Sequence, residues 1–173
     1  MRRLIVLLAL IALVIAASGC KRKRKARVEA PPDDGKLLSV LQVADPRGAV
    51  QLLSGFHNVE NDAWRWTQGK FAVSLRIPEG AAKKTTVLEL KFVLPQVILD
   101  KLKSVTLTAT AGGVALPSES YVKAGDYTFR REVPASVLKG EALTVEFALD
   151  KAFPPTPQDE RELGLIVSTI SLQ

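Results

Sequence analysis

Apolar and polar residues alternate along much of the chain after residue 70. In residues 70–78, Phe71, Val73 and Leu75 fall on one face of an extended segment, and the polar residues between them fall on the other face. Three later segments repeat the pattern: residues 87–94, 104–110 and 143–150. Such alternation is typical of a strand that buries one face and exposes the other. Each of these segments therefore predicts a half-buried strand.

Shorter apolar runs at residues 121–122, 127–133 and 164–172 predict further strands. Glycine-containing pairs and triplets separate the strands and predict turns, at residues 112–113, 124–126 and 139–140. Helical patterns are confined to residues 95–102 and 134–138, and neither is long enough to cover a sheet. The pattern therefore predicts an all-β fold, an antiparallel β-sandwich with jelly-roll topology, formed by one domain over residues 36–173.

The N-terminus has the layout of an export signal. Two arginines precede an apolar run over residues 4–16, which is shorter than the about 20 residues that a spanning helix needs. The following Ala-Ser-Gly-Cys, at 17–20, resembles the lipobox of bacterial lipoproteins. The resemblance implies that residues 1–19 are a signal peptide and that the thiol of Cys20 carries a lipid. Because Cys20 is the only cysteine, the domain is expected to have no disulfide.

The positive charge of the chain is concentrated beside the expected anchor. The chain carries 24 basic and 18 acidic residues, a net charge of +6, and the run KRKRKAR at 21–27 supplies six of the positive charges. With Arg2 and Arg3 also set aside, the remaining residues sum to −2. This excludes a nucleic-acid-binding domain, whose structured face should be basic. Residues 20–35 are instead predicted to form a tether whose cations contact anionic lipid headgroups.

Two arrangements at the membrane remain open. The basic run opposes export, so a reversed signal anchor with a cytoplasmic domain is an alternative to the lipoprotein. The short apolar run and the lipobox favour the lipoprotein, in the cell envelope and facing the periplasm or the exterior. Lys21 stands where an Asp would direct retention at the inner membrane in enterobacterial sorting, which favours the outer membrane.

The segment FHNVENDAWRW, at 56–66, contains the only histidine and both tryptophans. His57 alone cannot build a zinc site, which needs three or four ligands, and no Ser or Cys is paired with a base for nucleophilic catalysis. Glu60 and Asp62 are two residues apart, but a glycosidase needs its carboxylates at a defined separation across a sugar. The sequence therefore predicts no catalytic residues, no metal site and no cofactor.

Trp64 and Trp66 lie on the same side of an extended segment, with Arg65 on the other side. One interpretation makes the tryptophans a stacking platform for sugar rings, with His57 and Asp62 as further ligand contacts. The other interpretation makes them core residues, and this is favoured for Trp66, which leads into a predicted strand. Both interpretations stay open for Trp64.

Two segments together resemble a known group of domains. GFHNVENDAWRWTQGKFAVSLRIP, at 55–78, and DERELGLIVSTISL, at 159–172, are similar in kind and order to motifs of small jelly-roll domains attached to bacterial glycosyltransferases and other envelope polysaccharide proteins. The resemblance implies a non-catalytic, carbohydrate-associated module of the galactose-binding-like type. This chain differs in standing behind an anchor without a transferase domain.

The two motifs also carry charges that can pair across the fold. Arg65 and Arg161 are predicted to bind carboxylates, with Glu60 and Asp159 as the expected partners, because the planar guanidinium can tie two loops together. The sequence thus leaves two functions open. In the first, the module has an envelope glycan as its partner. In the second, it is a structural or protein-interaction accessory lipoprotein without a small-molecule ligand.

Overall fold

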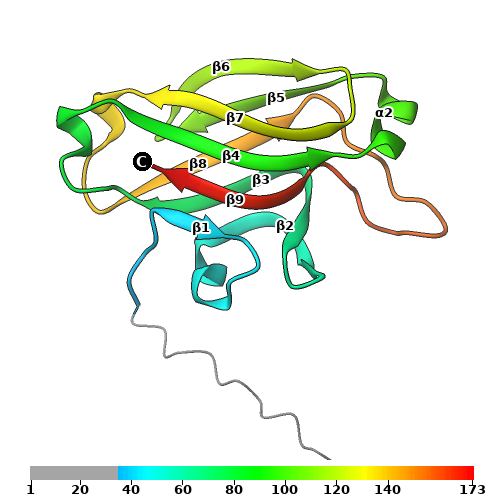
Figure 1. The fold of residues 1–173 in the computed structure, drawn as a ribbon, viewed down its shortest axis with the longest axis horizontal. Coiled ribbons are helices and arrows are strands. Elements are labelled where there is room, and N and C mark those ends of the chain that lie inside the picture. Colours follow the sequence, from blue (N-terminus) through cyan, green and yellow to red (C-terminus); the bar gives the residue numbers. More distant parts are fainter. Residues whose placement is uncertain (1–34) are drawn as a thin grey trace, which may run out of the picture.

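The structure, a computed structural model, describes residues 35–173 (Figure 1). Nine antiparallel strands make up most of this part of the chain. The predicted signal peptide, Cys20 and all of the tether except residue 35 lie outside the described residues. The strands, in chain order, are β1 (Val40–Gln42), β2 (Leu52–Glu60), β3 (Trp64–Arg76), β4 (Thr86–Leu94), β5 (Val105–Ala111), β6 (Val114–Tyr121), β7 (Gly125–Val133), β8 (Ala142–Leu149) and β9 (Ile166–Leu172).

Within residues 35–173, helical structure is limited to short pieces, as the sequence predicted. The α-helix is α2 (Gln96–Leu102), and the 3₁₀ turns are η2 (Pro46–Gln51), η3 (Ala81–Lys83) and η4 (Ala135–Val137). Lys151 contacts the end of α2, where its Nζ donates to the Leu102 carbonyl at 3.4 Å and to the Ser104 carbonyl at 3.2 Å. Within residues 35–173, no helix is long and apolar enough to cross a membrane.

The strand order confirms the jelly-roll prediction. One layer has the order β1-β9-β4-β7, and the other has the order β2-β3-β8-β5-β6. If β2 is set aside and the other strands are counted in sequence, the layers read 1-8-3-6 and 2-7-4-5, which is the double Greek key of a jelly roll. The layers join along β3, which pairs with β9 at Arg65 and Trp66 and with β8 from Lys70 to Arg76.

The core lies between the layers and is built from the alternating residues. Phe71, Val73 and Leu75 of β3 are at most 2% exposed, and the alternate residues of β4, β5 and β8 are buried in the same way. The rings of Phe71 and Phe147 stack with centroids 4.8 Å apart, and Phe56 meets Phe71 edge to face at 5.4 Å. Replacing such a buried Phe with Ala costs about 3–5 kcal/mol, so this core supplies much of the stability.

The side of the sandwich between β6 and β7 is closed by Arg131. Its guanidinium donates to the Pro117 carbonyl at 2.5 Å and pairs with Glu119 at 2.8 Å, and it lies 4.1 Å from the centre of the Phe129 ring. These contacts join two strands that do not share a hydrogen-bonded ladder. The two layers therefore form a nearly closed sheet.

Candidate functional site

The candidate site lies where the β2–β3 hairpin meets the loop between β8 and β9, near the end of the sandwich that carries α2 (Figure 1). Asn61 and Asp62 form the hairpin turn with φ angles of 49° and 54°, and the Ala63 amide donates to the Glu60 carbonyl at 3.1 Å. Asn and Asp tolerate this left-handed conformation better than other non-glycine residues. The local sequence therefore fits the turn, and Asp62 is exposed at its tip.

A bulged stretch of β2 directs the chain towards the loop. The pairing of β2 with β3 shifts register three times between Leu52 and Val59. At the second shift Gly55 has a φ of 75°, and a Cβ there would lie 2.1 Å from the Lys70 carbonyl oxygen. Only glycine fits this approach, and the bend that it permits brings Phe56 onto Phe71.

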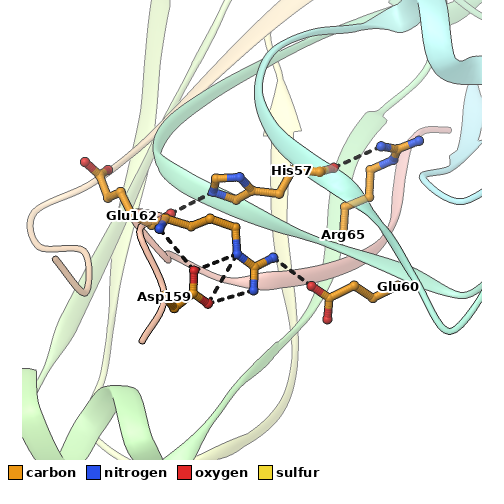
Figure 2. Close-up of polar contacts among 6 residues, drawn as sticks. His57, Glu60, Arg65, Asp159 and Glu162 are labelled. Atoms are coloured by element: carbon orange, nitrogen blue, oxygen red, sulfur yellow. Dashed lines mark hydrogen bonds and ion pairs between the residues drawn. The ribbon is translucent and has the colours of Figure 1, made fainter. Parts of the chain in front are cut away.

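Arg161 joins two carboxylates from distant parts of the chain, as Figure 2 shows. Its guanidinium donates to Glu60 at 2.7 Å and to both oxygens of Asp159, with Nη2–Oδ2 at 2.8 Å and Nε–Oδ1 at 2.9 Å. The pairing of Arg161 with Glu60 and Asp159 that the sequence predicted is thus present. Glu60 and Arg161 are 101 residues apart, so the contact ties the hairpin to the loop.

The charges in this cluster shift two pKa values. Hydrogen bonds from the side chain and the backbone amide of Arg161 lower the pKa of the Asp159 carboxyl to about 2. The same contacts with Asp159 and Glu60 raise the pKa of Arg161 above its ordinary value. The three side chains are 36–37% exposed, so solvent still screens the pairs. The cluster is therefore a fixed, partly solvated ion-pair network at neutral pH.

His57 and the residues after Arg161 add hydrogen bonds between the same two segments. The His57 Nε2 donates to the Glu162 carbonyl at 2.7 Å, and the Glu162 carboxylate accepts from the Gly69 amide at 2.5 Å (Figure 2 shows the first bond). Below them Thr67, which is fully buried, exchanges hydrogen bonds with the backbone of Leu165. His57 is therefore held in the fold through Nε2, and its Nδ1 makes no hydrogen bond within residues 35–173.

The expected pairing of Arg65 with a carboxylate is wrong. Its Nε donates to the Val43 carbonyl at 2.7 Å, and its Nη1 donates to the His57 carbonyl at 2.9 Å. The side chain is half-buried beside β1 and β2, where backbone carbonyls fill its donor positions and Glu60 is instead bound by Arg161. Arg65 thus ties the start of the domain to the hairpin.

The two tryptophans occupy intermediate positions. Trp66 is half-buried and packs against the core. Trp64 is half-buried at the start of β3, opposite Glu60, and its Nε1 is enclosed without a hydrogen-bond partner among residues 35–173. A buried N–H without an acceptor is costly, and among the described residues of this site Trp64 carries such a group.

Two carboxylates of the site are committed to ion pairs with Arg161. Glu60 and Asp159 both bind Arg161, and the lowered pKa of Asp159 keeps that group ionised rather than ready to donate a proton. Within the described residues, no group of three or more His, Cys, Asp or Glu side chains is placed to hold a metal ion. The ion-pair network can therefore position the hairpin against the loop, and its two carboxylates are held by Arg161.

Sequence reasoning missed several residues that build the site. Glu162 and Thr67 were not singled out, although each links segments more than ninety residues apart. Gly164 allows this contact, because a Cβ there would lie 2.7 Å from both Thr67 Oγ1 and the Gln68 carbonyl oxygen. The glycine that follows Leu163 at the entry to the last strand was the available signal.

No protein-family model and no curated protein matches this chain. Among solved structures, the chain is similar to the CBM36-1 domain of a multidomain xylanase from the hindgut metagenome of Trinervitermes trinervoides. The sequence identity is 11% and the TM-score is 0.40, and the match covers 78% of this chain and 94% of that chain.

Two further carbohydrate-binding modules show likenesses of the same order. The module CBM36 in complex with calcium and xylotriose has 8% identity, covers 79% of this chain and 100% of that chain, and has a TM-score of 0.41. The mannan-recognising module TmCBM27 has 12% identity, covers 79% and 95%, and has a TM-score of 0.46. The assignment of the fold rests on the strand order described above, and the ligands of those modules are properties of those modules.

Proposed function

We propose that this chain is a lipid-anchored, non-catalytic module of the bacterial cell envelope that binds an envelope glycan. The lipobox-like Ala-Ser-Gly-Cys and the apolar run before it support anchoring through Cys20. The basic run at 21–27 supports contact with anionic headgroups. The absence of a disulfide partner for Cys20 fits a thiol that is used for the lipid.

The observation that carries the proposal is the meeting of the two motifs that resemble envelope polysaccharide modules. Arg161, from the second motif, binds Glu60 of the first, and His57 binds the Glu162 carbonyl. These contacts hold the β2–β3 hairpin rigidly, with Asp62 exposed in its turn and Trp64 directly after the turn. A sugar, which offers an apolar ring face and hydroxyl groups, suits this hairpin because the hairpin carries an aromatic ring, the Asp62 carboxylate and the His57 imidazole.

The proposal is tested by binding of envelope polysaccharides to the full chain in detergent micelles. Trp64→Ala should abolish most of the binding, and Trp64→Phe should keep a large part of it, because an aromatic face remains. Val122→Ala, at a side chain that is 66% exposed on the β6–β7 side, is the matched surface control. Equal binding by Trp64→Ala and the wild type would contradict the proposed site.

One observation favours the accessory function as a second candidate. Val50 in η2 is 70% exposed and Leu53 in the edge strand β2 is 51% exposed, and they are three residues apart. Apolar side chains at the edge of a sheet are common in protein-interaction surfaces. A photo-crosslinking residue at position 53 should capture one specific envelope protein in cells under this function, and the same residue at position 122 should not.

A further inference from the structure

A hollow of about 850 Å³ lies at the end of the sandwich away from the Arg161 cluster. Its walls are the first described residues, 35–38, the loop 77–83 after β3, and the residues before β8. Strand β3 starts at Trp64 in the Arg161 cluster and ends at Arg76 in this hollow, which separates the two places by about 40 Å at 3.3 Å per residue. The C-terminus lies at the same end as the hollow (Figure 1).

Charged side chains of both signs line the hollow. Arg76 and Lys83 are exposed cations, and Glu79 and Glu141 are exposed carboxylates. Within residues 35–173, none of these four side chains makes a hydrogen bond or an ion pair. They are close in the fold, since the Ile77 amide next to Arg76 donates to the Glu141 carbonyl at 2.8 Å. The hollow thus offers both cationic and anionic side chains to one ligand.

Two further cations and an apolar lining complete the hollow. Arg47, which binds Asp45 at 2.6 Å, and Lys36 both line it. The apolar residues are half-buried or buried, and they come from three segments of the wall: Leu37, Leu38, Ile77 and Leu138. A ligand that fits must therefore carry charges of both signs and an apolar part.

We propose that this hollow binds one phospholipid whose head group carries a phosphate and a free ammonium, of the phosphoethanolamine type. The phosphate lies against Arg76 and Lys83, the ammonium against Glu79 and Glu141, and the start of the acyl chains against the leucines. A purely anionic head group would leave two carboxylates facing it without a partner, so charge complementarity favours the zwitterionic head.

The place where the described chain begins supports a membrane ligand. Residue 35 lines the hollow, and fifteen residues separate it from Cys20. Fully extended, they span at most about 50 Å, so a bilayer that holds Cys20 is within reach. If the basic run at 21–27 lies on the lipid surface, only about seven residues, roughly 23 Å, remain between that surface and the hollow. This inference rests on the proposed anchoring for the presence of the lipid.

The test measures retained lipid on the full chain in maltoside micelles by native mass spectrometry. The probes are dihexanoyl phosphatidylethanolamine and dihexanoyl phosphatidylglycerol, added at equal concentration. We expect the ethanolamine lipid to bind at least threefold more tightly, because both of its charges find partners. Because added lipid is measured directly, the result does not depend on acylation of Cys20 or on glycan binding at Trp64. A failure of the lipid proposal can therefore be distinguished from a failure of the proposed anchoring or glycan binding.

Two variants separate the two halves of the head group. Arg76→Gln should weaken both lipids at least threefold, since it removes a phosphate partner. Glu141→Gln should weaken the ethanolamine lipid and leave the glycerol lipid unchanged or stronger. Lys70→Gln on β3, the strand of Arg76, and Glu146→Gln on β8, the strand that follows Glu141, are matched controls outside the hollow. No binding, no preference between the lipids, or equal losses in the controls would each overturn the proposal.

Discussion

Replacing Arg161 with alanine removes the ion pair between the loop that joins β8 to β9 and the β2–β3 hairpin. The guanidinium contacts Glu60 at 2.7 Å, and both side chains are 37% exposed. Exposed ion pairs contribute about 0.2–1 kcal/mol, and a pair held rigidly by a second carboxylate belongs near the upper limit. We therefore expect a coupling energy of about 0.5–1 kcal/mol between Arg161 and Glu60. In a domain of this size, about 1 kcal/mol lowers Tm by roughly 4 °C.

The coupling is measured by a double-mutant cycle on the full chain, followed by thermal unfolding with circular dichroism. The cycle uses Arg161→Ala, Glu60→Gln and the double variant. Arg130→Ala is the matched control, because Arg130 pairs with Glu89 across two strands that are already hydrogen-bonded to each other. Arg161→Ala should lower Tm more than Arg130→Ala does. An unchanged Tm, or a coupling energy near zero, would refute the view that this pair ties the hairpin to the loop.

Three further predictions concern the backbone, the pH and the anchor. In denaturant unfolding, Gly55→Ala should destabilise the chain by several kcal/mol more than Gly113→Ala does. Both glycines have left-handed φ angles, but only Gly55 lies against the Lys70 carbonyl. Because its pKa is lowered from 3.8 to about 2, ionised Asp159 adds stability above about pH 5, and this is lost as pH falls from about 4 to 2. In thermal melts, Asp159→Asn should lose less stability than the wild type between pH 4 and pH 2, because it has no carboxylate to protonate at this position. Metabolic labelling with a fatty acid should mark the wild type and not Cys20→Ser, and equal labelling would exclude lipidation at this residue.

Period-two alternation was sufficient to predict much of the sheet. It marks the second half of β3 and strands β4, β5 and β8, whose alternate side chains face a continuous core. Strand β6 (Val114–Tyr121) was predicted only at residue 121, and strands β1 and β2 were not predicted. β1 has three residues, and the three register shifts in β2 break the alternation that would have marked it. Both are edge strands, where pairing on one side leaves a weaker apolar pattern.

The candidate site was predictable as far as it depends on charge and motif order. Arg161 could be matched to Glu60 and Asp159, because a guanidinium near two carboxylates has few better partners. Arg65 could not, because its partners are backbone carbonyls, which are present at every residue. The hollow at the other end was not predicted either, since its lining comes from several segments that only the jelly-roll topology brings together.

The central claim is that a glycan binds beside Trp64, and the emission of that tryptophan tests it most directly. The full chain carrying Trp66→Phe has Trp64 as its only tryptophan. Titration with oligosaccharides released from envelope polysaccharide should shift or quench its emission in a saturable manner, because a sugar would cover the exposed part of the ring. Saturable binding of the same oligosaccharides without any change in the Trp64 emission would contradict the account, and so would an absence of binding.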